Sequence, residues 1–306
     1  PKASSGDFSL CGRIGLLLLM PLFTCLPFSG CGDSKNRVVV GSKQFTEQKI
    51  LGEMVCQLIE RNTNLTVDRR LGLQGTKVAF AALREGDIDV YPEYTGTALI
   101  NILERDYERG MDRDEIYDLV KRQWSKKWAL RWLDPLGFDN TYVYSMRKQH
   151  AAELGVTKIS ELEPHCDSIQ GGFDHEYSTR PEYKQFEEVY GFSFENVTKL
   201  DPDLTYRALK DGEVDIIDAF STDGRIQAYD FRALEDDKEL FPPYDAAFVV
   251  REDLAKRHPE IVEQLDQLSG NITAADMRKM NYDVSENLEA PASVAAAFLR
   301  RKGLIE

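Results

Sequence analysis

Short apolar segments alternate with amphipathic segments along the chain. Residues 38–41 form a β-branched run that ends in glycine, which is typical of a buried strand. From Thr46 onwards, apolar residues recur three and four positions apart, and this spacing predicts an amphipathic helix. A second strand is expected at residues 66–71, a second helix at 78–84 and a third strand at 88–91. Strands that alternate with helices in this way predict an α/β domain with parallel strands.

The later part of the chain repeats this alternation. A weak strand at residues 168–170 precedes a turn at Gly171-Gly172. Helices are expected at residues 183–190 and 204–209, and a strand is expected at 214–219. Three more helices are expected near the end, at residues 259–268, 274–281 and 291–302.

One segment occurs twice in similar form. Residues 82–89, Ala-Leu-Arg-Glu-Gly-Asp-Ile-Asp, align with residues 208–215, Ala-Leu-Lys-Asp-Gly-Glu-Val-Asp. In each copy an aromatic residue, Tyr94 or Phe220, stands eight positions after the glycine and next to hydroxyl residues. Chance is the alternative, because helix–glycine–strand units are common. If the two segments are instead related copies, they predict two similar lobes whose strand ends face a shared crevice. Such a crevice is where α/β folds bind ligands.

Length, composition and charge narrow the possible functions. The 306 residues suffice for two domains, and 42% apolar with 29% charged residues is a globular balance. A net charge of −14 without a long basic run argues against a nucleic-acid partner. The sequence contains no nucleophile elbow, zinc-protease motif, phosphate-binding loop or dinucleotide fingerprint. We therefore expect no enzyme activity, no catalytic residue, no cofactor and no metal site.

The N-terminal segment has the features of an export signal. Arg13 precedes an apolar run over residues 14–28, which prolines interrupt and which is shorter than the roughly 20 residues of a membrane span. The run leads into Phe28-Ser29-Gly30-Cys31, which resembles the bacterial lipobox, a motif whose cysteine is diacylated and becomes the mature N-terminus. We expect residues 1–31 to contain the signal peptide and Cys31 to carry the lipid anchor. An ordinary signal peptide with an incidental cysteine is the alternative.

Several aromatic residues lie in segments that proline or glycine makes rigid. Residues 91–97, Tyr-Pro-Glu-Tyr-Thr-Gly-Thr, are expected to form a loop at a strand end, and Tyr142 follows Gly-Phe-Asp-Asn-Thr. Residues 242–245, Pro-Pro-Tyr-Asp, place a tyrosine where the chain could cross between lobes. Aromatic faces attract cations such as quaternary ammonium groups, by roughly 0.5–2 kcal/mol per ring. Ordinary core packing is the alternative for each of these tyrosines.

Three motifs together resemble those of the substrate-binding proteins of osmoprotectant ABC importers. They are residues 41–48, Gly-Ser-Lys-Gln-Phe-Thr-Glu-Gln, and the segments 91–97 and 242–245. Members of that family take up glycine betaine, proline betaine, carnitine or choline. The resemblance implies a two-lobed type II periplasmic binding protein of the Venus-flytrap kind, each lobe a mixed, mostly parallel sheet flanked by helices. With the internal repeat, it assigns residues 36–139 plus 244–306 to the first lobe and residues 140–243 to the second.

The resemblance also implies which residues bind the ligand. A box of rings would surround a trimethylammonium group, and cationic and hydroxyl groups would hold a carboxylate. Carried over position by position, the cation cage comprises Tyr94, Tyr142, Phe220, Tyr244 and Asn140. The carboxylate would meet Lys43, Thr97 and Arg180, whose planar fork suits a carboxylate. The alternative for Arg180 is a surface ion pair with Glu176 or Glu182.

These features predict an exported, membrane-anchored lipoprotein that binds a quaternary-ammonium zwitterion such as glycine betaine. Its expected partners are the permease and ATPase subunits of an ABC importer, and we expect it to be a monomer. Choline or ergothioneine as the ligand, and a ligand-sensing receptor lobe as the function, are the alternatives. Lys43 and Arg180 favour a ligand that has a carboxylate.

Overall fold

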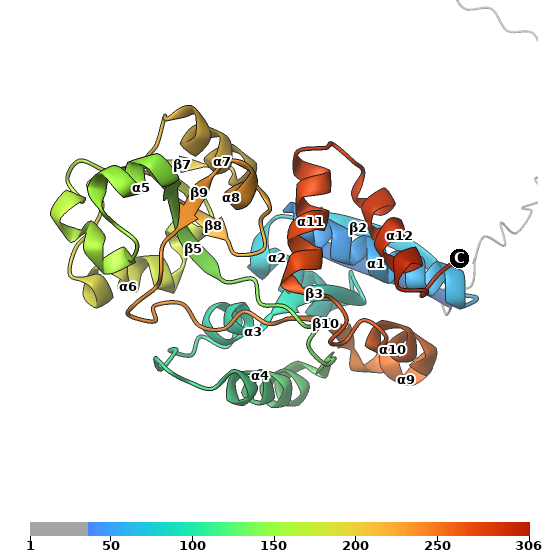
Figure 1. The fold of residues 1–306 in the computed structure, drawn as a ribbon. Helices are drawn as coiled ribbons and strands as arrows, with labels where there is room; N and C mark the ends of the chain where they lie inside the picture. The colour runs from blue at the N-terminus through green and yellow to red at the C-terminus, as the bar shows by residue number, and fades with distance from the viewer. Residues whose placement is uncertain (1–35) are drawn as a thin grey trace, which may run out of the picture. The chain divides into compact units, whose positions relative to one another are not determined.

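The strands that lie within residues 36–306 form two five-stranded sheets, shown in Figure 1. The structure is a computed structural model that describes residues 36–306, so the predicted signal peptide and Cys31 lie outside the described residues. The first sheet has the order β2 (Thr66–Leu73), β1 (Arg37–Lys43), β3 (Val90–Tyr94), β10 (Ala246–Arg251) and β4 (Leu130–Trp132). The second has the order β7 (Asn196–Leu200), β6 (Gln170–Asp174), β8 (Ile216–Phe220), β5 (Tyr142–Arg147) and β9 (Phe231–Ala233).

The two sheets share one pattern of strand pairing. In the first, β1 pairs in parallel with β2 and β3, while β10 is antiparallel to β3 and β4. In the second, β6 is parallel to β7 and β8, while β5 is antiparallel to β8 and β9. The two-lobed α/β class with mixed sheets is therefore confirmed. The expectation that the sheets are mostly parallel is wrong, because parallel and antiparallel pairings are equal in number. We call the sheet of β1 and its helices the first lobe and the sheet of β6 and its helices the second; the predicted residue boundaries of the lobes stay a prediction.

Helices cover both faces of each sheet, so alternate residues of a strand enter different cores. Val40 packs against α1, which also contacts α10, α11 and α12, whereas Tyr91 packs on the side of α2 and α4. None of the helices within residues 36–306 has the length and apolar character that a membrane span requires. The longer helices are α1 (Thr46–Asn62), α2 (Gly75–Glu85), α4 (Arg113–Trp128), α6 (Pro181–Tyr190), α7 (Pro202–Asp211), α10 (Pro259–Asp266), α11 (Ala274–Ser285) and α12 (Pro291–Arg301). The shorter ones are α3 (Thr95–Thr97), η2 (Ala98–Ile102), α5 (Lys148–Leu154), η3 (Ile159–His165), η4 (Tyr177–Thr179), α8 (Arg225–Ala228) and α9 (Glu252–Arg257).

The internal repeat is present in three dimensions. Gly86 ends α2 and Gly212 ends α7, both in the left-handed conformation at φ +85° and +79°, which glycine adopts without a steric penalty. Three residues further on, the carboxylates of Asp89 and Asp215 each accept a hydrogen bond from a backbone amide of the neighbouring strand, at 2.8 and 3.0 Å. Matching caps and matching strand contacts confirm that the aligned segments form equivalent units.

Two details of the expected elements are wrong. Gly171 and Gly172 lie inside β6 and form no turn. A Cβ atom at Gly172 would lie 2.9 Å from the side chain of Val214, so the strand needs glycine there for close packing. Residues 91–94 belong to β3 and not to a loop, because pairing with β10 continues as far as Tyr94.

The two segments that connect the sheets lie side by side. Asp139 and Asp245 form an antiparallel bridge, and the amide of Asn140 donates to the carbonyl of Tyr244 at 3.1 Å. The guanidinium of Arg113 donates to the carboxylates of both aspartates, at 2.8 and 2.9 Å. Burial raises the pKa of Asp245 to about 6, and the charge of Arg113 opposes that rise. The cation of Arg113 thus links the two segments that connect the sheets.

Candidate ligand-binding site

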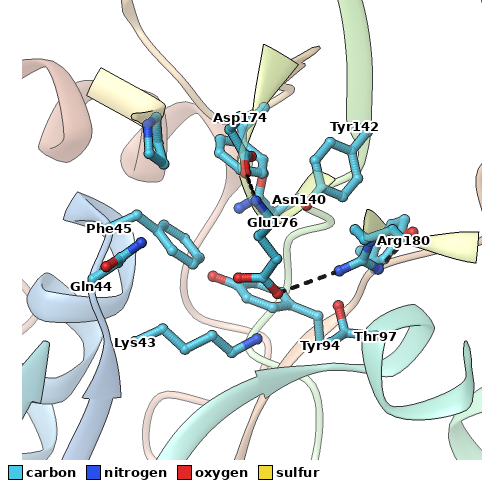
Figure 2. Close-up of a pocket in the computed structure, with 13 residues that line it drawn as sticks. Lys43, Gln44, Phe45, Tyr94, Thr97, Asn140, Tyr142, Asp174, Glu176 and Arg180 are labelled. Atoms are coloured by element: carbon cyan, nitrogen blue, oxygen red, sulfur yellow. Dashed lines mark hydrogen bonds and ion pairs between the residues drawn. The ribbon is translucent and has the colours of Figure 1, made fainter. Parts of the chain in front are cut away.

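A pocket at the strand ends of both lobes contains all eight residues predicted for the site, and Figure 2 shows it. Lys43 ends β1, Tyr94 ends β3, Asp174 ends β6 and Phe220 ends β8. The carboxyl ends of parallel strands therefore face one another across the pocket, as expected for an α/β fold. The predicted residues that line it are Lys43, Tyr94, Thr97, Asn140, Tyr142, Arg180, Phe220 and Tyr244, and their roles in binding stay predictions. Sequence reasoning missed Gln44, Phe45, Asp174, Glu176 and Pro202.

Five rings from both lobes form a continuous chain along the pocket. Ring centroids are 6.2 Å apart for Tyr94 and Phe45, and 5.5 Å apart for Phe45 and Phe220. The chain continues through Tyr142, 5.1 Å from Phe220, to Tyr244, 5.8 Å further and nearly perpendicular. Ring faces carry negative charge density, so this surface suits an apolar cation.

Phe45 joins the ring at the end of β3 to the ring at the end of β8. It occupies the N-cap position of α1, where its side chain makes no capping hydrogen bond. That position usually carries Ser, Thr, Asp or Asn, because their side chains satisfy the free amides of the first turn. A phenylalanine immediately before the predicted helix start at Thr46 is therefore unusual. Its place within the motif of residues 41–48 could have identified it as a site residue.

Arg180 is buried, with 2% of its surface exposed, so the alternative of a surface position is wrong, whereas the ion pairing that it named is present. Its Nε and Nη2 atoms donate to one carboxylate oxygen of Glu182, at 3.1 and 2.6 Å. The guanidinium carbon lies 5.1 Å from the ring centre of Tyr142 and 5.6 Å from that of Tyr244. The third nitrogen, Nη1, is 3.9 Å from a carboxylate oxygen of Glu176. Arg180 therefore has an internal ion partner and stacks on two of the predicted cage rings.

Lys43 is also paired inside the protein. Its ammonium group donates to Glu93 at 2.6 Å and to the hydroxyl of Thr76 at 3.1 Å, and all three residues are buried. A buried ammonium needs such a partner, because desolvation of an unpaired ion costs several kcal/mol. Thr97 is buried as well, and Figure 2 shows its hydroxyl directed into the pocket.

Glu47, in the first turn of α1, is the most heavily hydrogen-bonded carboxylate near the pocket. One of its oxygens accepts from the hydroxyl of Tyr94 at 2.7 Å and from the amide of Asn140 at 2.8 Å. The other accepts from the hydroxyl of Thr222 at 2.6 Å and from the amide of Asn281 at 3.1 Å. Burial raises the pKa of Glu47, and these four hydrogen bonds oppose the rise. Because Thr222 follows β8 and Glu47 belongs to α1, this carboxylate connects the two lobes.

A pair of acidic side chains lies under the second-lobe wall of the pocket. Asp218, in β8, accepts a hydrogen bond from the amide of Asp174 at 2.9 Å. Its other oxygen has no hydrogen-bond partner among the residues that the structure describes. Burial, and then the charge of Asp174, raise the pKa of Asp218 well above its usual range. Burial beside a second acidic group therefore disfavours the charged form of Asp218.

A two-lobed α/β fold with an aromatic pocket at the facing strand ends defines a substrate-binding protein of the periplasmic type. Over residues 36–301 the chain belongs to the family described as the substrate binding domain of ABC-type glycine betaine transport systems. It is therefore a transport protein and not an enzyme, and such proteins work outside the cytoplasm. No cluster of side chains within residues 36–306 could hold a metal ion.

Similarities to individual proteins and structures support the same family assignment. The carnitine transport binding protein OpuCC of Listeria monocytogenes is 33% identical over 297 residues, covering 95% of this chain and 96% of that protein. The ergothioneine transport permease/ergothioneine binding protein EgtU of Helicobacter pylori is 33% identical over 269 residues, covering 87% of this chain and 48% of that protein. A crystal structure described as a glycine betaine/carnitine/choline ABC transporter superposes with a TM-score of 0.73 at 30% identity, covering 88% of this chain and 100% of the other.

We predict that Glu47→Gln destabilises the protein and weakens ligand binding. The NH2 group of the glutamine would face donors that now bind a carboxylate oxygen. The charge-assisted hydrogen bonds to Glu47 would also be lost. The expected decrease in the free energy of unfolding is about 2 kcal/mol. Urea unfolding followed by tryptophan fluorescence measures it.

Glu60→Gln is the matched control, because Glu60 lies on the same helix but pairs with Arg69 near the surface. Loss of that exposed pair should cost about 0.5 kcal/mol. Equal unfolding free energies for the two variants would contradict the role given to Glu47.

Proposed function

We propose that the pocket binds a small quaternary-ammonium zwitterion of the glycine betaine type and that the protein delivers it to an ABC importer. The observation that carries this proposal is the chain of five rings contributed by both lobes. Such a surface attracts a methylated ammonium group, which has no N–H to donate and is weakly hydrated. Ligand that touches rings of both lobes stabilises the closed arrangement, as a binding protein requires.

The arrangement of charges supports one orientation of the ligand. Its methyl groups would lie among the rings of Tyr94, Phe45 and Phe220 and the neighbouring ring of Tyr142, 5.1 Å from that of Phe220. Its carboxylate would lie towards Thr97 and the Nη1 atom of Arg180, the nitrogen that does not donate to Glu182. A carboxylate held there receives a charge-assisted hydrogen bond, which compensates for its desolvation.

Choline is the second candidate, and a separate observation favours it. Lys43 and Arg180 are both paired with internal carboxylates, and Asp174 and Glu176 add further acidic groups to the pocket lining. Such a pocket attracts a ligand with a net positive charge. Ergothioneine, the other alternative ligand, is supported by the name of the Helicobacter relative.

The proposal extends to the partners and location of the protein. A monomer anchored by a lipid on Cys31 would present its ligand to separate permease and ATPase subunits. A sensing role for the same pocket is the alternative, in which the closed form would contact a receptor. Genes for a permease and an ATPase beside this one would favour import.

Tyr142 offers the cleanest test of the cage, because the hydroxyls of Tyr94 and Tyr244 also hold carboxylates. Tyr142→Phe should bind glycine betaine nearly as well as the unaltered protein, since the ring face remains. Tyr142→Leu keeps an apolar side chain but removes that face, and it should weaken binding by about 1–2 kcal/mol. Calorimetric titration measures both, with Tyr117→Leu on α4 as a control outside the pocket. Equal affinities for the Phe and Leu variants would show that the ring face does not contact a cation.

Arg180 allows a zwitterion to be distinguished from a simple cation. We expect glycine betaine to bind at least about tenfold more tightly than choline, a difference of ~1.4 kcal/mol. Arg180→Ala should weaken glycine betaine strongly and leave choline nearly unchanged. Because that variant leaves Glu182 buried without its partner, the double variant Arg180→Met/Glu182→Gln repeats the test without an unpaired charge. Tighter binding of choline to the unaltered protein, or equal losses for both ligands, would exclude the carboxylate role.

The anchor is tested in cells. Cys31→Ser should abolish incorporation of labelled lipid and move the protein from the membrane fraction into the soluble fraction. Ser29→Ala serves as a control, because it alters the same segment and keeps the cysteine. Membrane association that is the same with and without Cys31 would refute a lipid anchor at this position.

A further inference from the structure

Glu176 directs a carboxylate into the pocket from the second lobe, where Figure 2 shows it between Lys43 and Arg180. It lies between β6 and η4. One of its oxygens accepts a hydrogen bond from the hydroxyl of Thr76 at 2.8 Å, and the same oxygen is 3.9 Å from Nη1 of Arg180. A Cβ atom at Gly75 would lie 3.3 Å from the other oxygen, so glycine leaves room for this carboxylate at the start of α2.

The groups around this carboxylate are those that the proposed ligand's carboxylate would contact. Thr76 is also hydrogen-bonded to the ammonium of Lys43 at 3.1 Å, so its hydroxyl lies between that cation and Glu176. Arg180 faces Glu176 through Nη1, while its other donors are directed at Glu182 and at the hydroxyl of Tyr244. The protein therefore places one of its own carboxylates where the ligand's carboxylate is expected.

The backbone at Glu176 is held firmly, whereas its side chain has access to solvent. The backbone amides of Glu176 and Tyr177 both donate to the buried carboxylate of Asp174. The side chain of Glu176 is 33% exposed, in contrast to 2% for Arg180. Rotation about its side-chain bonds can thus remove the carboxylate from the pocket without moving the main chain.

We propose that Glu176 determines ligand specificity by competing with the ligand's carboxylate. This inference depends on the proposed function, because it assumes that a quaternary ammonium group occupies the aromatic surface. When a zwitterion binds, Glu176 leaves Arg180 and turns towards solvent. When a cation without a carboxylate binds, Glu176 remains in place and adds negative charge near the ligand. Its presence therefore favours simple cations and disfavours zwitterions, a form of discrimination through repulsion.

Glu176→Gln tests this inference with three ligands. The substitution removes the charge but keeps an oxygen that can accept the hydrogen bond from Thr76, so folding should be preserved. Calorimetry would compare glycine betaine, choline and tetramethylammonium, the last of which can use only the aromatic surface. We expect the variant to bind glycine betaine about fivefold more tightly and the two simple cations about twofold less tightly, which shifts the affinity ratio about tenfold.

Glu188→Gln is the matched control, because Glu188 is exposed on α6 in the same lobe and the change in net charge is identical. Its affinity ratio should equal that of the unaltered protein. Glu176→Gln could leave the ratio of the affinities for glycine betaine and tetramethylammonium unchanged, or shift it in favour of tetramethylammonium. Either result would overturn the role of Glu176 and leave the proposed function intact. Failure of all three ligands to bind the unaltered protein would overturn the proposed function and this inference together.

Discussion

Glu47 carries a carboxylate that does not reach water, and an unpaired charge in that position would cost several kcal/mol. Four donors compensate for this cost, and they come from β3, from a connecting segment, from the turn that follows β8 and from α11. The orientation of Tyr94, the approach of the second lobe and the position of α11 therefore all depend on one side chain. A carboxylate satisfied from so many segments defines a unique arrangement of its surroundings, because each missing donor would leave part of the charge exposed to a low dielectric.

The remaining charges near the pocket follow the same rule of internal compensation. Lys43 is balanced by Glu93 and Arg180 by Glu182, so neither cation waits for a ligand in order to be stable. The pocket can therefore form before ligand arrives, with the rings already in contact. A ligand carboxylate competes with these internal ion pairs for the same donors. Its contribution to the binding free energy is therefore only the difference between the hydrogen bonds it makes and those it replaces. Small changes in the acidic side chains around Arg180 can then alter ligand preference while the aromatic surface stays the same.

Local patterns in the sequence predicted the elements that depend on local interactions. The apolar spacing after Thr46 identified α1, and the repeated glycine–strand segment identified two equivalent units. All eight predicted site residues line one pocket, because their identities were carried over from a resemblance. Local patterns cannot predict contacts between residues that are distant in the sequence. The hydrogen-bond partners of Glu47 lie between 47 and 234 positions away along the chain. Gly172 looked like part of a turn for the same reason, since only the packing of Val214 requires glycine there.

The return of the chain to the first sheet through β10 also sets an order in which the chain can assemble. In the first sheet, β3 and β4 are joined only through β10, which begins at Ala246, after every strand of the second sheet. A chain that folds from its N-terminus can thus complete the second sheet while the first still lacks a strand and exposes the edge of β3. Unpaired edges of this kind are prone to pair with other chains. The segment from β10 to the last residue therefore completes the first lobe and covers the strand edge on which an incomplete chain would aggregate.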